Sequence, residues 1–214
     1  MTLEATRIRL VMELRQQGIT DRAVLSAIER TPREAFVPEA FHDQAYENTA
    51  LPIGHGQTIS QPAVVAYMTQ ALELGPRMKV LEVGTGCGYQ AAVLAQLCRR
   101  VYTIERYREM MREAESRFRA LRINNVITKW GDGAKGWPEQ APFDRVIVTA
   151  ASPEVPRALL DQLADEGILV APVGKTTYEQ TLMRYRRHGE SIEGEKLWAV
   201  RFVPLVEGTV NGGN

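Results

Sequence analysis

Apolar residues recur every three to four positions near the start of the chain, which is the period of a helix with one buried face. This spacing predicts a helix over residues 3–17 that ends at Gly18. A second helix should start after Thr20, whose hydroxyl can cap it, and should end before Pro32. Residues 33–60 lack such a period, and we expect an irregular segment there.

Farther along the chain, short apolar runs alternate with helical segments. A third helix should begin at Pro62, since proline suits a first helical turn. After it we expect strands at 79–83, 101–105, 126–130, 144–149 and 167–172, helices at 88–98, 107–121 and 154–164, and two late strands at about 181–187 and 196–203. This alternation is typical of an α/β fold, so we expect a Rossmann-like sheet with helices on both faces and an N-terminal helical extension.

The most informative segment joins the first of these strands to its helix. It reads Val-Leu-Glu-Val-Gly-Thr-Gly-Cys-Gly-Tyr over residues 80–89, with glycines at every second position. Glycines at such a turn allow a sharp bend and let a ligand approach main-chain atoms. A dinucleotide fingerprint needs its third glycine where Tyr89 stands, so the spacing disfavours NAD. An acidic residue followed by G-x-G-x-G resembles the first motif of S-adenosylmethionine-dependent methyltransferases.

The later strands also end in polar or small residues. Glu105 lies 21 residues after Gly84, close to the ~20-residue offset of an acidic residue that binds ribose hydroxyls. Asp132 stands between two glycines, where it can accept a hydrogen bond from an adenine amino group. Ligands of open α/β sheets bind at the carboxyl ends of the strands, so these positions together predict a cofactor site. Taken alone, Glu105 fits a solvated strand end equally well.

Three further segments make the resemblance more specific. Residues 51–62 read Leu-Pro-Ile-Gly-His-Gly-Gln-Thr-Ile-Ser-Gln-Pro, and the other segments are 143–151 and 201–205. Together with the glycine motif they resemble the protein-L-isoaspartate O-methyltransferase family over residues 8–207. This family methylates the free α-carboxylate of L-isoaspartyl residues in damaged proteins and peptides. The ester then collapses to a succinimide, which partly hydrolyses to normal aspartate.

The resemblance implies roles for residues of this chain. Ser60 is the expected catalytic residue beside the transferred methyl group. The expected contacts to S-adenosylmethionine are Thr58, Ile59, Ser60, Glu82, Gly84, Gly86, Gly88, Glu105, Asp132 and Gly133. The expected walls of the peptide site are Leu51 to Gly54, including Pro52, Ile53 and Gly54, and Val203 to Val206. We expect no metal, because the histidines and cysteines are scattered.

The implied chemistry needs few side chains. A carboxylate with a pKa near 4 is ionised at neutral pH, so its attack on a sulfonium methyl group needs no general base. A serine that orients the carboxylate would suffice. The alternative is that Ser60 only caps the helix that begins at Pro62. Similarly, His55 can contact substrate or only hold its loop, and Trp130 and Trp137 can stack on adenine or pack in the core.

We expect a single methyltransferase domain over residues 1–207. Its parts would be an N-terminal helical and substrate-loop extension over 1–75 and a cofactor-binding core over 76–207. A chain of 214 residues suffices for one such domain. The polar, glycine-rich residues 208–214 should form a flexible tail.

Composition narrows the choice of partners. The 26 basic and 26 acidic residues balance, so nucleic acid is not an expected partner. No secretory signal is visible, and no uncharged apolar run reaches the ~18 residues that span a membrane, so we expect a cytoplasmic protein without a membrane partner. Cys87 and Cys98 should be reduced thiols, since their helical spacing separates them by about 16 Å. The expected partners are isoaspartyl-containing proteins and peptides, and we expect a monomer.

Two other functions stay open. A methyltransferase of the same fold could act on a small molecule or RNA, although the balanced charge and the serine motif count against it. A catalytically silent binding module would be expected to lack Ser60 or Glu105, and both are present.

Overall fold

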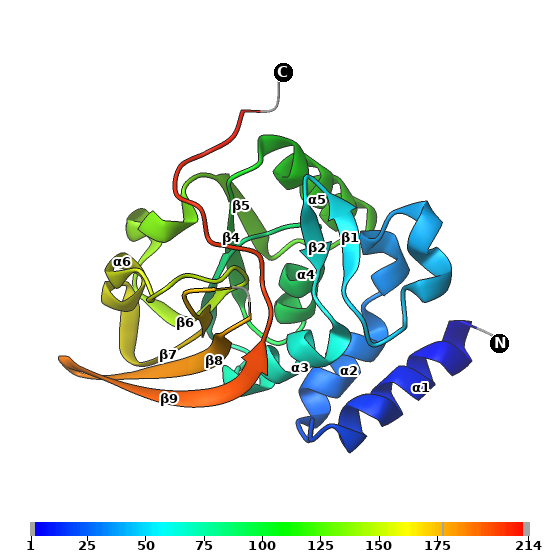
Figure 1. The fold of residues 1–214 in the computed structure, drawn as a ribbon, viewed down its shortest axis with the longest axis horizontal. Helices are drawn as coiled ribbons and strands as arrows, with labels where there is room; N and C mark the ends of the chain where they lie inside the picture. Colours follow the sequence, from blue (N-terminus) through cyan, green and yellow to red (C-terminus); the bar gives the residue numbers. More distant parts are fainter. Residues whose placement is uncertain (1–2, 177, 212–214) are drawn as a thin grey trace.

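A computed structural model of the chain describes residues 3–176 and 178–211. Within these residues, seven strands form one sheet in the order β5-β4-β3-β6-β7-β8-β9 (Figure 1). The strands are β3 (Lys79–Val83), β4 (Arg100–Glu105), β5 (Val126–Trp130), β6 (Phe143–Val148), β7 (Leu163–Val173), β8 (Gln180–His188) and β9 (Ser191–Val200). Neighbours from β5 to β7 are parallel, whereas β8 is antiparallel to β7 and β9. The expected Rossmann-like sheet is present, and an antiparallel hairpin extends one edge.

Each face of the sheet carries its own buried core. On one face Val80 and Ile147 pack with side chains of the first five helices. On the other face Leu81 and Val146 pack with Leu159 of α6. The helices are α1 (Leu3–Gln16), α2 (Arg22–Arg30), α3 (Pro62–Ala71), α4 (Tyr89–Ala95), α5 (Arg108–Ala120) and α6 (Arg157–Asp161). Helices therefore cover both faces, as the sequence predicted.

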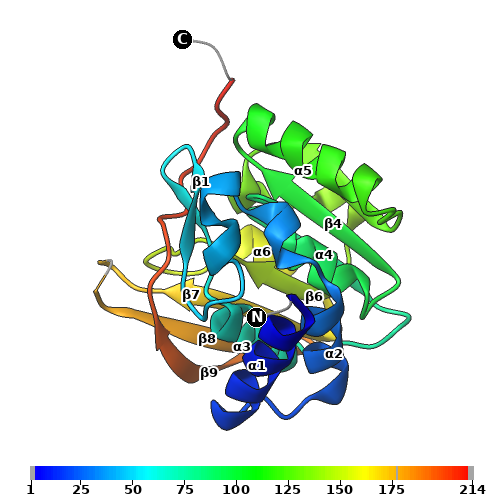
Figure 2. The ribbon, with the colours of Figure 1, turned by 90° about the vertical axis from the view of Figure 1, so that its right-hand side faces the viewer.

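The N-terminal helices share the larger core with the sheet. Figure 2 shows α1, α2 and α3 grouped below α4. Leu14 of α1 and Ile28 of α2 are fully buried in the same cluster as Val80 of β3. The expected helical extension is therefore present and is packed directly onto the sheet domain.

The N-cap of α2 differs from the prediction. Asp21 caps this helix, because its carboxylate accepts hydrogen bonds from the backbone N–H groups of Ala23 and Val24. The backbone N–H of Thr20 instead donates to the side chain of Gln70 at 2.8 Å. The Asp21 carboxylate thus satisfies two backbone N–H groups of the first helical turn that have no partner within the helix. Thr20 lies one residue before the N-cap position and does not bond to these groups.

Residues 33–60 are more regular than their sequence indicates. They contain the 3-10 helices η1 (Arg33–Phe36) and η2 (Glu39–Gln44), and a hairpin of β1 (Leu51–Gly54) and β2 (Gln57–Ile59). The hairpin turn needs a positive φ at Gly54, His55 and Gly56. Strands of four and three residues are too short to show a period of two in the sequence.

Two late elements also differ from the predicted bounds. The helix predicted at 154–164 is only α6, because Pro156 precedes its first residue and β7 already begins at Leu163. The last strand was expected at 196–203 but runs from Ser191 to Val200, because the hairpin turn with β8 lies at Gly189. The loop before β6 holds the short 3-10 helices η3 (Gly133–Lys135) and η4 (Pro138–Gln140).

The segment after β9 crosses the carboxyl ends of the parallel strands (Figure 1). Pro204 bridges Ala151, and Val210 bridges Tyr107. The Val210 N–H donates to the carbonyl of Arg106 at 2.8 Å. Residues 208–211 of the predicted flexible tail are therefore anchored at Val210, and residues 212–214 lie outside the described residues.

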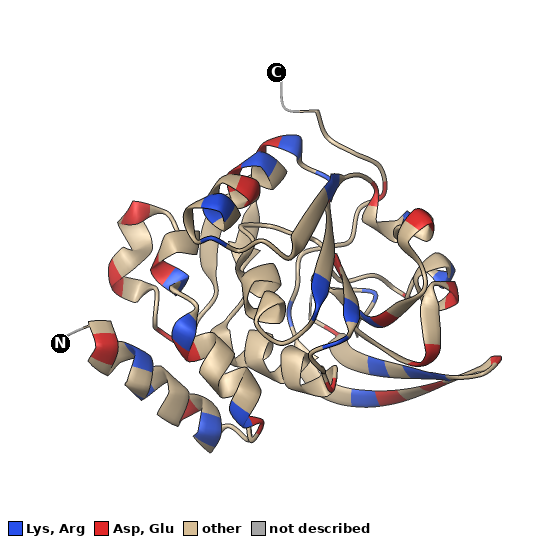
Figure 3. Cartoon of the chain, turned by 180° about the vertical axis from the view of Figure 1, so that it is seen from behind, with Lys and Arg blue, Asp and Glu red and all other residues tan. Residues whose placement is uncertain are grey.

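Charges of both signs are interspersed along α1, α5 and the β8–β9 hairpin (Figure 3). None of the described helices combines the length and the apolar character that crossing a membrane requires.

Candidate active site

The turn between β3 and α4 presents main-chain atoms to a cavity at the carboxyl end of the sheet. Gly84, Gly86 and Gly88 have φ values of 96°, 54° and 94°, which favour glycine. A Cβ at Gly84 would lie 2.3 Å from the Thr149 hydroxyl. That hydroxyl lies 3.0 Å from the carbonyl oxygen of Val83 and 2.7 Å from that of Gly84. Thr149, at the end of β6, therefore holds the turn in place, and only glycine fits beside it.

Glu105 ends β4 beside this turn. Its carboxylate oxygens accept hydrogen bonds from the backbone N–H groups of Gly86 at 2.9 Å and Tyr107 at 3.0 Å. The residue is only 5% exposed and lines the cavity, so it is not a solvated strand end. A carboxylate has about four acceptor positions, so two are left for a ligand.

Glu82 lies beneath the turn and not in the cavity. It is fully buried, and one of its oxygens accepts a hydrogen bond from Thr103 at 2.5 Å. The Thr103 hydroxyl in turn lies 2.7 Å from the hydroxyl of Thr85. Burial raises the pKa of Glu82 to about 8, with a further contribution from the charge of Glu105, so the group is neutral at pH 7. This chain of hydrogen bonds joins β3, β4 and the glycine turn.

Ser60 follows β2 directly and does not cap α3. Gln61 occupies the N-cap position, and its side chain makes no capping bond. The Asn48 side chain accepts the hydrogen bond from the Ala63 N–H at 2.9 Å. No described residue forms a hydrogen bond with the Ser60 hydroxyl, so that hydroxyl is available to a ligand. The interpretation of Ser60 as a helix cap is wrong.

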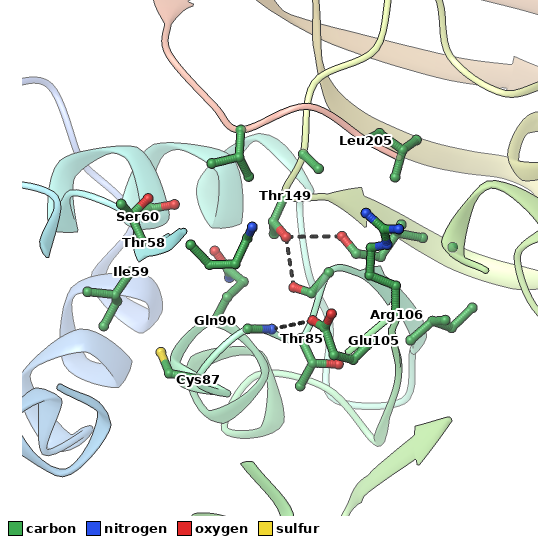
Figure 4. A pocket seen from close by; sticks show the side chains of 18 of the residues that line it. Thr58, Ile59, Ser60, Thr85, Cys87, Gln90, Glu105, Arg106, Thr149 and Leu205 are labelled. Atoms are coloured by element: carbon green, nitrogen blue, oxygen red, sulfur yellow. Dashed lines mark hydrogen bonds between the residues drawn. The ribbon is translucent and has the colours of Figure 1, made fainter. Parts of the chain in front are cut away.

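Two cavities meet at Ser60. The first, of about 240 Å³, lies between the glycine turn, Glu105 and residues 203–206. The second, of about 520 Å³, extends from Ser60 toward the end of β9. Both are lined by Thr58, Ser60, Thr149 and Val203. Figure 4 shows Ser60 and Glu105 on opposite sides of the first cavity.

The segment after β9 forms one wall of the first cavity. The Ala151 N–H donates to the Val203 carbonyl at 2.8 Å, and the Leu205 N–H donates to the Ala151 carbonyl at 2.7 Å. These bonds fix residues 203–206 across the end of β6. Val206 lines the cavity and is 42% exposed, so it lies at the rim.

Most of the residues predicted from the sequence lie around the first cavity. Those that line it are Thr58, Ile59, Ser60, Gly84, Gly86, Glu105, Gly133 and the run from Val203 to Val206. Those that do not are Leu51, Pro52, Ile53, Gly54, Glu82, Gly88 and Asp132. The Asp132 carboxylate accepts a hydrogen bond from the Ala134 N–H at 3.0 Å and thereby caps η3. The Ile53 side chain comes within 3.5 Å of the position of a Cβ on Gly86, so the hairpin packs onto the glycine turn.

The positions of the two tryptophans and His55 favour a structural role for each. Neither tryptophan lines the two cavities. Trp137 packs edge-on against Tyr102 at a centroid distance of 5.4 Å, and Trp130 donates to the Arg106 carbonyl at 3.0 Å. His55 lies at the hairpin tip, 3.5 Å from the carboxylate of Glu109. All three are explained by protein contacts.

Several residues that support the site carried no signal in the sequence. Asn48 and Arg33 lie in the aperiodic segment before the hairpin, and Arg33 donates to the Ser60 carbonyl at 2.8 Å. Gln90 lines the first cavity and donates to Thr69 at 3.0 Å. Their roles depend on contacts between distant segments, which no local spacing reveals. Among the described residues, no group of three or more His, Cys, Asp or Glu side chains could hold a metal ion.

Comparison with known proteins identifies the family. The model of the protein-L-isoaspartate(D-aspartate) O-methyltransferase family matches residues 5–210. The chain belongs to this family. The protein-L-isoaspartate O-methyltransferase of Parvibaculum lavamentivorans is 60% identical over 207 residues, which cover 96% of this chain and 93% of that protein. The enzyme of Maricaulis maris is 61% identical over 201 residues, or 94% of each chain.

Solved structures agree with this assignment. The structure of a protein-L-isoaspartate O-methyltransferase superposes on this chain with a TM-score of 0.85 at 30% identity. The matched region covers 96% of this chain and 66% of that protein. A Plasmodium falciparum protein described as the same enzyme was crystallised with S-adenosyl-L-homocysteine. It has a TM-score of 0.79 at 25% identity, covering 92% of this chain and 97% of that one. The fold is that of the S-adenosylmethionine-dependent methyltransferases. The activity is that of the family, methylation of isoaspartyl residues as a step in protein repair.

Proposed function

We propose that methyl transfer takes place where the two cavities meet, with the cofactor in the first and the isoaspartyl residue in the second. The observation that carries this proposal is the position of the Ser60 hydroxyl, which borders both cavities and has no hydrogen-bond partner among the described residues. Sites that join two reactants need such a shared boundary, because the reacting atoms must approach within about 3–3.5 Å.

The first cavity suits S-adenosylmethionine, which supplies an electrophilic methyl group when bound. The main chain at Gly84 and Gly86 allows close approach of the methionine portion. Glu105 has acceptor capacity for ribose hydroxyls beyond its two backbone bonds. Gly133 lines the cavity and would meet the adenine, whereas Asp132 shapes that loop through its bond to Ala134.

The second cavity suits a peptide carboxylate. Ser60 donates its hydroxyl hydrogen to one carboxylate oxygen and so aims the other oxygen at the first cavity. The carboxylate is ionised at neutral pH, so no residue need remove a proton. Small residues such as Thr49, Ala50 and Ala199 line this cavity together with larger ones such as Tyr178 and Arg201, and the cavity of about 520 Å³ is large enough for part of an extended peptide. The hairpin with Pro52, Ile53 and Gly54 would bound the peptide site on one side.

We also propose a monomeric, cytoplasmic enzyme that acts on proteins and peptides and needs no metal. The balance of 26 basic and 26 acidic residues supports the absence of a nucleic-acid partner. The interspersed charges in Figure 3 support the same conclusion for the face shown there.

Replacing Ser60 tests its catalytic role. Ser60→Ala should lower kcat on an isoaspartyl peptide by on the order of tenfold to a hundredfold, because the carboxylate loses its orienting donor. Affinity for S-adenosylhomocysteine should change less than about twofold, and the denaturation midpoint should hardly move, since no protein bond is lost. Initial rates, calorimetry and urea denaturation measure the three effects.

Asn48→Ala is the matched control from the same segment. It removes the acceptor for the Ala63 N–H and should cost about 1 kcal/mol of stability, with far less effect on kcat. Equal kcat values for Ser60→Ala and the unmodified enzyme would refute the catalytic assignment of Ser60.

A further inference from the structure

Arg33 is a buried cation without an acidic partner. It begins η1 and has an exposed fraction of 0%. No carboxylate of the described residues lies within ion-pair distance of it. The neighbouring Glu34 is bound by Arg7 at 2.8 Å and by the Tyr46 hydroxyl. Burial lowers the pKa of Arg33, but an arginine side chain stays protonated in proteins.

The hydrogen bonds of the Arg33 guanidinium go to residues that line the second cavity. One terminal nitrogen donates to the carbonyl oxygen of Ser60 at 2.8 Å and approaches that of Thr49 at 3.4 Å. The Nε and the other terminal nitrogen have no partner among the described residues. The guanidinium carbon lies 4.7 Å from the ring centroid of Tyr89, so a cation–π contact compensates part of the lost hydration. Buried charges are normally paired, so this exception calls for an explanation.

The peptide group between Ser60 and Gln61 lies between Arg33 and the second cavity. Both residues line that cavity, whereas Arg33 lines neither cavity. This peptide bond is trans, so the Gln61 N–H points opposite to the Ser60 carbonyl and hence away from Arg33. No described residue accepts a hydrogen bond from that N–H. The other free N–H groups at the start of α3 bond to Asn48 and to the Gln61 carbonyl.

We propose that Arg33 is a positioning residue that fixes and polarises this peptide group, so that the Gln61 N–H and the Ser60 hydroxyl together bind the substrate carboxylate. The inference rests on the proposed function, because it concerns the same carboxylate. A hydrogen bond to a carbonyl strengthens the donor at the other end of the peptide group. A positive charge behind the peptide adds attraction for an anion, and the burial of Arg33 weakens the screening of this charge by water.

The arrangement discriminates between substrate and product. The substrate is a carboxylate, whereas the methyl ester product is neutral. Both donors and the field of Arg33 favour the anion, so the product loses much of this attraction as soon as it forms. Arg33 therefore contributes to binding the substrate and to releasing the ester, without touching either.

The test compares two peptides of nearly the same shape, of which only one carries the negative charge. One carries an isoaspartyl residue, and the other carries an α-carboxamide in place of its α-carboxylate. Calorimetry with S-adenosylhomocysteine bound gives the affinity of each. The unmodified enzyme should prefer the carboxylate by about tenfold or more, which is the effect of one or two hydrogen bonds to a charged group. Arg33→Met should reduce this preference to within about threefold, and Arg33→Lys should keep most of it.

If Arg33 had a purely structural role, Arg33→Met would weaken the binding of both peptides equally, and the ratio of their affinities would stay the same. If Arg33→Met does not fold, Arg33→Lys decides the matter. A folded Arg33→Lys without the preference shows that the charge is not the cause and overturns the inference.

A second pair of variants tests the N–H directly. Gln61 has φ −51° and ψ 134°, which proline adopts without strain. Gln61→Pro therefore deletes the N–H and keeps the backbone, and Gln61→Ala is the reference that loses the side chain but keeps the N–H. The preference for the carboxylate should fall at least about fivefold in Gln61→Pro relative to Gln61→Ala, the loss of one hydrogen bond to a charged group. Equal preferences in the two variants would overturn the inference. No preference in the unmodified enzyme would instead count against the proposed site itself.

Discussion

Individual side chains at this site act mainly by holding other groups in place. Thr149 fixes the glycine turn, Asn48 caps α3 and frees the Ser60 hydroxyl, and Glu82 joins two strands to the turn. Ser60 and Glu105 differ from these residues, because both line the first cavity and keep polar atoms with capacity for a ligand. The chemistry needs no general base, because the nucleophilic carboxylate is already ionised at neutral pH.

The buried carboxyl of Glu82 makes stability depend on pH. Its pKa rises from 4.5 to about 8 on folding, so the folded protein binds more protons than the unfolded chain between these values. Stability from this group is therefore complete below about pH 4.5 and is lost as the pH rises through about 8. Between pH 5 and pH 9, the free energy of unfolding of Glu82→Gln should rise relative to that of the unmodified protein by on the order of a few kcal/mol. Urea denaturation at several pH values measures this difference. A difference between the two proteins that does not vary with pH would contradict a neutral Glu82.

Among the elements, the strand–turn–helix unit of β3 and α4 shows how backbone conformation and packing combine. Gly88 has a φ of 94°, and a Cβ there would lie 2.8 Å from the ring of Phe118 and 3.2 Å from the side chain of Ala114. The turn therefore needs glycine for two separate reasons. One is the left-handed backbone, and the other is the close approach of α5.

Gly88→Ala should destabilise the protein by roughly 2–4 kcal/mol, because strain and steric overlap add. Gly189→Ala is the matched control. It also has a positive φ, of 58°, but no atom lies within 4 Å of its Cβ position, so strain alone should cost about 1 kcal/mol. Thermal denaturation of both variants measures the difference. Equal losses of stability in the two variants would contradict a contribution from the packing of Phe118 on Gly88.

Elements with a local signature could be predicted, and those built by distant contacts could not. The apolar runs of β3 to β6 and the spacing of Gly84, Gly86 and Gly88 are local, so the sheet and its turn followed from the sequence. The β1–β2 hairpin escaped prediction because its strands are too short for a period. The cap of α2 is ambiguous in the sequence, because Thr20 and Asp21 are both good capping residues, and only the structure shows that Asp21 caps the helix.

The same distinction applies to the site. Glu105 could be placed because its distance from the glycine turn follows from the length of one strand–helix unit. Arg33 could not, since its contacts with Thr49, Ser60 and Tyr89 exist only after three segments have packed together. Its burial cannot be read from one charged residue in an aperiodic stretch.

Three parts of the chain come together around one site. The sheet lines the first cavity with the carboxyl ends of β3, β4 and β6. The segment before α3 supplies Ser60, and residues 203–206 close the cavity from the other end of the chain. Because the two cavities share Ser60, the site that we propose for methyl transfer is complete only when all three parts are folded.

Methyl transfer to an isoaspartyl peptide, measured beside its aspartyl twin, tests the central claim most directly. The two peptides differ by one methylene moved between backbone and side chain, which an apolar pocket would distinguish by only roughly 1–3 kcal/mol. A carboxylate held by the Ser60 hydroxyl and the peptide main chain held beside it should select far more strongly, since the wrong isomer leaves buried polar groups unpaired. We expect kcat/KM for the isoaspartyl peptide to exceed that for the aspartyl peptide by a hundredfold or more, on the order that a hydrogen-bonding site achieves. Comparable methylation of both peptides would contradict the assignment of the second cavity to the isoaspartyl residue.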